Sequence, residues 1–106
     1  MATYEEFKKI ELKVGRIKEV NDHPNADRLY VIVVEMGDKT KQVVAGIKNF
    51  YQKEELIGKQ VVIVDNLDTA MLRGVESQGM LLAASDDEGL SIVTLDRPRK
   101  LGSVVK

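Results

Sequence analysis

The sequence contains no cysteine and no tryptophan, and His23 is its only histidine. Without cysteine the chain can form no disulfide, thiolate nucleophile or cysteine zinc cluster, and one histidine leaves any transition-metal site to carboxylates. Only two prolines occur among the 106 residues, and no Pro/Ser-rich or low-complexity tract marks a linker. We therefore expect one domain, residues 1–106, without a metal or other cofactor.

Long apolar runs and an excess of basic residues are also missing. No segment approaches the ~20 apolar residues needed to cross a bilayer, and the N-terminus lacks the basic and apolar regions of a secretory signal. These absences predict a cytoplasmic protein without membrane contact. Sixteen Lys and Arg against seventeen Asp and Glu give a net charge of -1, whereas phosphate-binding domains are usually basic. Any binding of nucleic acid must therefore come from a local arrangement of charge.

The residues needed for catalysis are equally scarce. His23 has no second base in a recognisable pattern, and no G-x-S-x-G nucleophile motif or phosphate-cradling glycine motif occurs. The acidic pairs Glu54-Glu55 and Asp86-Asp87 fall in a predicted helix and a predicted turn, where charged side chains are usually solvated. We predict no catalytic residues and no enzymatic activity.

Two short helices are expected. Thr3 and Glu6 have the spacing of a capping box, and Tyr4, Phe7 and Ile10 recur at helical intervals. Residues 53–57 form a second short helical pattern that Gly58 would terminate.

The remaining chain has the pattern of short strands. The alternation that begins at Leu12 slips after Gly15, which indicates a β-bulge in a curved strand. Residues 29–34 and 42–47 read as a hairpin, followed by strands at 61–64 and 79–84, the latter pairing with 90–93. A small helix between the third and fourth strands gives the element order of an all-β, five-stranded, Greek-key OB-fold barrel. Periodicity alone does not separate this fold from another small barrel.

The first motif is His23-Pro24-Asn25-Ala26-Asp27-Arg28-Leu29. Proline fixes its own φ, and Asn25 and Asp27 suit a tight turn in which their side chains bond nearby backbone amides. In one interpretation the segment simply joins two strands. In the other, Arg28 at the end of the turn offers its five donors to phosphate, unless Asp27 or another carboxylate pairs with it.

The second motif spans residues 66–82, with the sequence NLDTAMLRGVESQGMLL, and we expect a loop after Asn66. Single-stranded RNA is read by hydrogen bonds to base edges and by stacking. Asn66, Ser77 and Gln78 are suitable donors and acceptors, Arg73 could contact phosphate or a base, and Met80 could offer an apolar platform.

The same motif also has a structural interpretation. Met71, Leu72 and Met80 would then fill the end of the barrel core, while Gly74 and Gly79 would only permit tight backbone turns.

Other candidate positions are less distinctive. Phe50 and Tyr51 lie beside Lys48 and Lys53, so they could stack on bases or pack the second helix onto the barrel. Lys39 and Lys41, with the polar Gln42, edge the predicted hairpin. Three more cations cluster near the C-terminus, where they form either a solvated face or a local positive patch: Arg97, Arg99 and Lys100.

Together with segments 7–15, 43–47 and 77–84, the two motifs resemble the tRNA-binding domain found at the C-terminus of many methionyl-tRNA synthetases and as stand-alone tRNA-binding proteins. The resemblance implies an OB-fold barrel, a C-terminal segment that mediates homodimerisation, and non-catalytic, structure-dependent binding of tRNA. A partner could be the catalytic chain of methionyl-tRNA synthetase. The predicted RNA-binding residues are Arg28, Gln42, Asn66, Arg73, Ser77, Gln78 and Met80.

The family is also similar to the chaperone CsaA, so the alternative is a protein-interaction or peptide-binding module. RNA-binding members typically read Asn-Leu-Lys-Pro-Ala-Lys-Leu-Arg-Gly in the second motif, whereas this chain has Asp68, Thr69 and Met71 in place of the first lysine, the proline and the second lysine. These changes remove two cations and add an anion, which favours the alternative. Independently, residues 101–106 could add a strand across a two-fold axis, which predicts a C2 homodimer.

Overall fold

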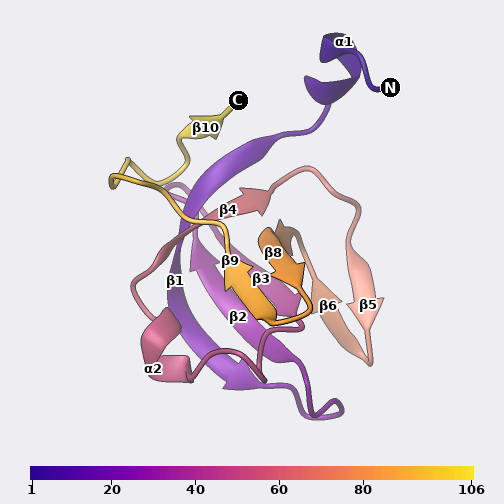
Figure 1. Cartoon of the computed structure of the whole chain (residues 1–106), viewed down its shortest axis with the longest axis vertical. Helices are drawn as coiled ribbons and strands as arrows, with labels where there is room; N and C mark the ends of the chain where they lie inside the picture. The colour runs from indigo at the N-terminus through magenta and orange to yellow at the C-terminus, as the bar shows by residue number, and fades with distance from the viewer.

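The long strand β1 (Leu12–Asp22) organises the fold. In the computed structural model, which describes residues 1–106, it lies at the centre of a sheet with the order β3-β2-β1-β4-β7 (Figure 1). Its first half pairs with β4 and its second half with β2, and the register shifts between Ile17 and Glu19. The predicted bulge is therefore confirmed, and it lets one strand serve both sides of a curved sheet. The other strands in this order are β2 (Tyr30–Glu35), β3 (Thr40–Ala45), β4 (Gln60–Val64) and β7 (Met80–Leu81), and β10 (Val104–Val105) joins the same sheet by pairing with β1.

Residues 76–78 close the sheet against β3. The Gln78 N–H donates to the Gln42 carbonyl over 2.7 Å, and the Val44 N–H donates to Ser77 Oγ over 3.0 Å. The result is a nearly closed antiparallel barrel, so the predicted OB-type architecture is confirmed.

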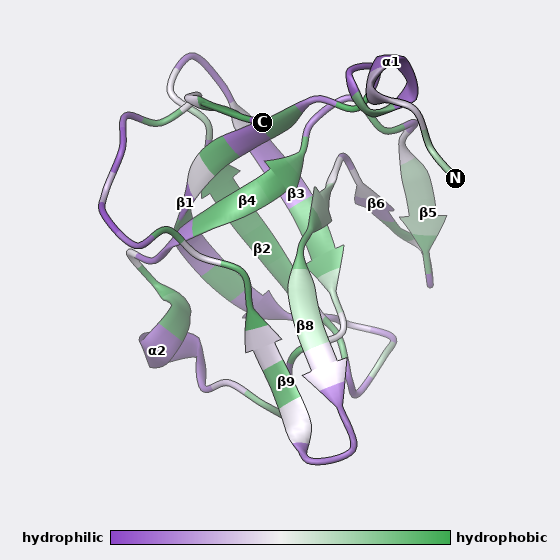
Figure 2. Cartoon of the chain, turned by 45° about the horizontal axis from the view of Figure 1, so that its top comes forward, coloured by the Kyte–Doolittle hydropathy of each residue, from purple (hydrophilic) through white to green (hydrophobic).

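One apolar core fills this barrel. The helix α2 (Lys53–Leu56) contributes Leu56, which is fully buried, and Gly58 follows the helix with a φ of +90°. The predicted helix and its glycine stop are thus confirmed. Figure 2 shows that hydrophobic residues dominate strands β2 and β4, whereas α2 is largely hydrophilic. The largest fully buried side chains are Ile17, Ile32, Met36, Leu56 and Ile63.

Two predictions after β4 were wrong. The expected loop contains a small hairpin, β5 (Ala70–Leu72) paired with β6 (Val75–Ser77). The expected strand at 79–84 divides at Leu82, whose N–H donates to Val62 and whose carbonyl accepts from Val93. The chain leaves the barrel sheet at this residue, because the following β8 (Ala83–Asp86) pairs with β9 (Gly89–Ile92) as a separate hairpin. The predicted pairing of this part of the chain with residues 90–93 is confirmed.

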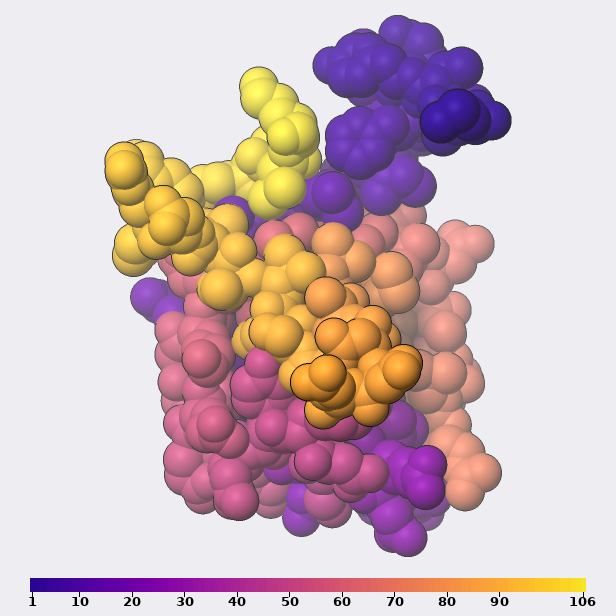
Figure 3. All heavy atoms as spheres, in the orientation of Figure 1, coloured from indigo at the N-terminus to yellow at the C-terminus, as the bar shows by residue number.

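Both chain ends lie at the same end of the molecule (Figures 1 and 3). The helix α1 (Tyr4–Phe7) has the predicted capping box but no buried residue, and it stands away from the barrel. The strand β10 (Val104–Val105) pairs with Leu12 and Lys13 of the same chain, so the C-terminal strand exists but is already partnered within the chain. No helix is long and apolar enough to span a membrane.

Candidate nucleic-acid interface

The two sequence motifs meet in space at one end of the barrel. His23 Nε2 lies 2.9 Å from the Leu72 carbonyl oxygen, and Asn25 Nδ2 donates to the Arg73 carbonyl over 3.1 Å. The connection between β1 and β2 therefore holds the turn of the β5–β6 hairpin, although 48 or 49 residues separate the paired positions. We call this surface the loop end, defined by residues 23–29 and 72–75; in Figure 1 it lies opposite the chain termini.

His23 is a buried structural residue of the loop end. Its Nδ1 accepts the Asn25 backbone N–H over 2.9 Å, so its Nε2 must carry the proton that is donated to Leu72. Only 5% of the residue is exposed. The segment thus does more than join two strands, and Asn25 bonds to the distant hairpin rather than to a nearby amide.

The hairpin turn holds Arg73 in an unusual conformation. Arg73 has a φ of +54° and Gly74 a φ of +87°, and Arg73 is the only residue other than glycine with positive φ. Two positive φ values between the paired residues Leu72 and Val75 make a two-residue hairpin turn of the type I′ class, which favours Asn-Gly. An arginine there costs about 1 kcal/mol relative to an unstrained backbone. Backbone conformations of this kind cluster at functional sites.

Arg28 and Arg73 are the cations of the loop end. Both are exposed, and neither forms an ion pair with a carboxylate. The only hydrogen bond of the Arg73 guanidinium is a long one, 3.5 Å from Nη2 to the Asn25 carbonyl oxygen. Asp27 therefore does not neutralise Arg28, and both guanidinium groups are free to bind an anion.

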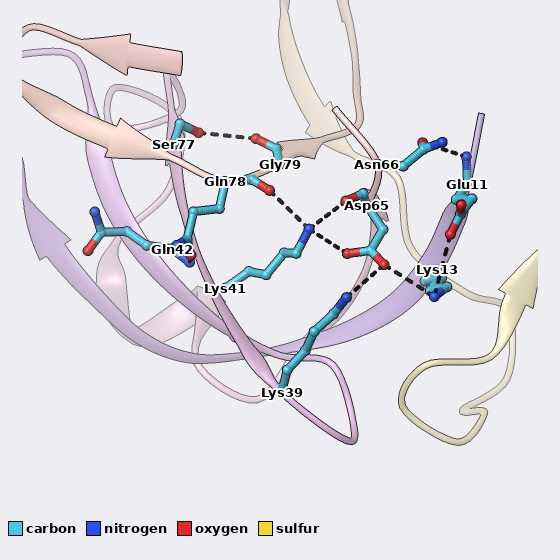
Figure 4. Close-up of polar contacts among 10 residues, drawn as sticks. All are labelled: Glu11, Lys13, Lys39, Lys41, Gln42, Asp65, Asn66, Ser77, Gln78 and Gly79. Atoms are coloured by element: carbon cyan, nitrogen blue, oxygen red, sulfur yellow. Dashed lines mark hydrogen bonds and ion pairs between the residues drawn. The ribbon is translucent and has the colours of Figure 1, made fainter. Parts of the chain in front are cut away.

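Gln42, Ser77 and Gln78 lie where the barrel closes (Figure 4). Ser77 is buried, and its hydroxyl donates to the Gly79 carbonyl while accepting from Val44. The Gln78 side chain accepts from the Gln42 N–H over 2.8 Å, and Gln42 Nε2 donates to the Glu76 carbonyl. These side chains join β3 to the end of β6 and to Gln78 directly after it.

Asn66 connects the barrel to the N-terminal segment. Its Nδ2 donates to the Lys9 carbonyl over 2.7 Å, and its Oδ1 accepts from the Glu11 N–H over 2.8 Å. Figure 4 shows Asn66 beside Glu11, at a distance from Ser77 and Gln42. The structure therefore does not bring Asn66 together with Arg28 and Arg73.

Apolar side chains are exposed along the second motif. Met71 is 64% exposed, Met80 47% and Leu72 40%, so the interpretation of these residues as core plugs was wrong. The core instead takes its methionine from Met36. Exposed methionine is an adaptable surface for bases or for apolar peptide side chains.

A buried ionic cluster around Asp65 was not predicted. Its side chain is 4% exposed, and the ammonium groups of Lys41, Lys39 and Lys13 lie 2.6, 3.1 and 3.2 Å from its oxygens (Figure 4). Burial acts to raise the pKa of Asp65, but the close contacts with the three lysine ammonium groups together outweigh it and lower the pKa to about 2. Lys41 approaches Oδ1 without good hydrogen-bond geometry and also donates to the Gln78 carbonyl. The only sequence signal was an aspartate directly after the apolar run of β4.

The remaining candidate cations and aromatics are largely occupied. Lys53 and Lys48 each lie 3.2 Å from Asp22, and their hydrogen bonds lower the pKa of that carboxyl group. The Tyr51 hydroxyl accepts from the Ile92 N–H, which supports its packing role, whereas Phe50 is 49% exposed. Near the C-terminus, Arg97 pairs with Asp96 and Arg99 bonds through its backbone to Gln60, while Lys100 is exposed. No cluster of three or more His, Asp or Glu residues is arranged to hold a metal ion.

Three comparisons relate the whole chain to known proteins. Residues 12–104 match the family model described as "Putative tRNA binding domain". The methionine–tRNA ligase of Thermococcus kodakarensis is 55% identical over 104 residues, which are 98% of this chain and 14% of that protein. The corresponding ligase of Pyrococcus furiosus is 53% identical over the same shares. The chain therefore spans about one seventh of the length of these relatives.

Solved structures give the same result. The MetRS related protein of Pyrococcus horikoshii is 31% identical, with a TM-score of 0.92 over 100% of this chain and 98% of that chain. The CsaA chaperone protein of Picrophilus torridus is 33% identical, with a TM-score of 0.93 and full coverage of both chains. The family matches nearly the whole chain, and both motifs lie within the matched residues. The chain belongs to the tRNA-binding domain family.

Proposed function

We propose that this chain binds tRNA without catalysing a reaction, and that it recognises the shape and phosphates of the RNA through the loop end. The observation that carries the proposal is the pair Arg28 and Arg73, two exposed guanidinium groups without carboxylate partners on two motifs that hydrogen-bond to each other. Planar guanidinium forks match phosphate geometry, and contacts to phosphate depend little on sequence.

The other predicted RNA-binding residues fall into two groups, according to whether their side chains already form hydrogen bonds within the protein. Met80 is exposed and can meet a base directly. Gln42, Asn66, Ser77 and Gln78 already bond within the protein, so each would have to exchange an internal hydrogen bond for one to RNA. For the buried Ser77 this exchange would also require the barrel closure to open, so these four residues support the surface more readily than they contact RNA.

Because the loop end carries only two free cations, we expect weak binding by a single copy. Each neutralised phosphate contributes about -0.9 to the slope of log K against log salt, so two arginines give a slope of about -2. Such an interaction gains strength when the domain is linked to a second copy or to a catalytic synthetase chain, because linkage raises the effective concentration of tRNA. We infer that the domain acts in this way in the cytoplasm, where tRNA is used.

The experiment is a fluorescence-anisotropy titration with unfractionated tRNA at several salt concentrations, beside an unrelated stem-loop of equal charge. Arg28→Gln and Arg73→Asn should each weaken tRNA binding and reduce the salt slope by about one. Arg97→Gln is the matched control, because Arg97 is exposed, pairs with Asp96 and lies outside the loop end. Equal losses in all three variants, or no preference for tRNA, would contradict the proposal.

We also propose a homodimer formed through the end that carries both termini. A groove of about 390 Å³ lies between α1 and β10 and is lined mainly by apolar side chains. Tyr4, Phe7 and Val104 are 69%, 42% and 68% exposed there, which favours an apolar partner surface. A second copy would bury the same patch on both chains around a two-fold axis.

Light scattering across micromolar concentrations tests the dimer. The unchanged chain should have twice the monomer mass, and Phe7→Ser should shift it toward the monomer while its far-UV circular dichroism stays constant, since α1 contributes nothing to the core. A monomer mass for the unchanged chain would remove this part of the proposal.

A second candidate function is the binding of an extended apolar peptide. The exposed Met71, Leu72 and Met80 support it, as does the replacement of two family lysines by Asp68 and Met71. Peptide binding that competes with tRNA, and that survives Arg73→Asn but not Met71→Lys, would favour this function over RNA binding.

A further inference from the structure

We propose that His23 is a positioning residue that fixes the Arg73 side chain for contact with RNA. This inference rests on the proposed function, because it concerns how the loop end is held rather than which ligand it binds. His23 itself is 5% exposed and is not available to the ligand. It acts through the 2.9 Å hydrogen bond from its Nε2 to the Leu72 carbonyl, the residue directly before Arg73.

The backbone strain at Arg73 explains why such a hold is needed. With a φ of +54°, Arg73 occupies a region that only a small share of non-glycine residues adopts. A short hairpin such as β5–β6, with three residues in each strand, contributes few bonds to enforce that conformation. The His23 side chain bonds to the Leu72 carbonyl and the Asn25 side chain to the Arg73 carbonyl. These two carbonyls belong to the peptide groups on either side of the Arg73 Cα.

The hold requires one particular form of the imidazole ring. The Asn25 N–H points at Nδ1, so Nδ1 must be an unprotonated acceptor and Nε2–H the donor. His23 therefore performs two separable tasks: Nδ1 closes the turn to Asn25, and Nε2 reaches across to the hairpin.

Two substitutions separate these tasks. In His23→Asn, Oδ1 can replace Nδ1 and close the turn to Asn25, but nothing reaches the Leu72 carbonyl. In His23→Gln, the longer amide places an N–H donor near the position of Nε2 and can restore the bond to Leu72. Both variants place an amide side chain at position 23. His23→Asn removes the hydrogen bond to the Leu72 carbonyl, and His23→Gln restores it.

The test measures tRNA affinity of both variants, alone and combined with Arg73→Asn. His23→Asn should weaken binding about fivefold, the change that corresponds to one hydrogen bond of about 1 kcal/mol. His23→Gln should bind as the unchanged chain does. In the Arg73→Asn background His23→Asn should cause no further loss, because the side chain that it positions is already absent.

The outcomes separate this inference from the proposed function. Unchanged affinity in His23→Asn, or an equal loss with and without Arg73, would overturn the positioning role. If Arg73→Asn alone binds tRNA as tightly as the unchanged chain, the proposed contact between Arg73 and tRNA is wrong, and the proposed function fails rather than the positioning role alone. Should His23→Asn not fold, nitrogen NMR of the unchanged chain decides: a proton on Nδ1 rather than Nε2, or a negative φ from the Arg73 couplings, would refute the hold.

Discussion

Replacing Asp65 by asparagine isolates the energy of the buried ionic cluster, because asparagine resembles the protonated form of aspartate in size and shape. The pKa of Asp65 falls from 3.8 to about 2 in the folded chain. Each unit of pKa difference between the folded and unfolded states corresponds to about 1.4 kcal/mol, so ionised Asp65 contributes roughly 2–3 kcal/mol to the free energy of unfolding. The side chain is 4% exposed, so solvent screening reduces this value little.

The sign of the effect gives a pH profile. Because the folded-state pKa lies below the unfolded value, the stabilisation is complete well above pH 3.8 and is lost as the pH falls toward about 2. Urea unfolding followed by far-UV circular dichroism suits this chain, which has no tryptophan. Asp65→Asn should be less stable than the unchanged chain by roughly 2–3 kcal/mol near neutral pH, and the difference should fall toward zero only as the pH drops below about 2.

An exposed carboxylate provides the matched control. Asp22 also lies between two lysines, but its side chain is 53% exposed, so Asp22→Asn should change the urea midpoint much less. Parallel stability curves for Asp65→Asn and the unchanged chain across the whole pH range would refute the reasoning, because the difference would then not depend on ionisation of Asp65.

Three further substitutions test packing and hydrogen bonding. In Gly15→Ala a Cβ atom would overlap Val34 Cγ1 in the core, so we expect a loss of about 1–3 kcal/mol of unfolding free energy in a urea titration. Tyr30→Phe removes the 2.7 Å bond from a buried hydroxyl to the Tyr51 carbonyl and should cost about 1 kcal/mol, again measured by urea unfolding. Asn66→Ala should speed amide hydrogen exchange in the N-terminal segment while leaving the protection of the barrel strands unchanged, since its two bonds hold only that segment.

Much of the fold was predictable because its signals are local. The capping box at Thr3, the slip of period after Gly15 and the glycine stop at Gly58 each depend on residues a few positions apart, and the structure has all three features. The break at Leu82 was not predictable in this way. Residues 79–84 read as one strand, and only the competing partners β4 and β9 divide it.

The candidate site was harder to predict because its contacts are distant in sequence. The motifs identified the two segments, but not that His23 bonds to the carbonyl of Leu72, 49 positions later. Turns usually lie on the protein surface, and nothing in the sequence near His23 indicates burial. Asp65 was missed for the same reason, since its three lysines come from β1 and from the β2–β3 hairpin.

The net charge of -1 hides an uneven distribution of paired and unpaired cations. Asp22 and Asp65 together hold five of the lysines in ion pairs, so those cations add little to the field outside the protein. Arg28 and Arg73 are left without such partners at the loop end. Because salt screens exposed charges beyond about 10 Å, an anion approaching the loop end responds to these nearby guanidinium groups rather than to the net charge. A chain that is neutral overall can therefore present a local cationic surface, and its affinity for a polyanion should follow the number of unpaired arginines there.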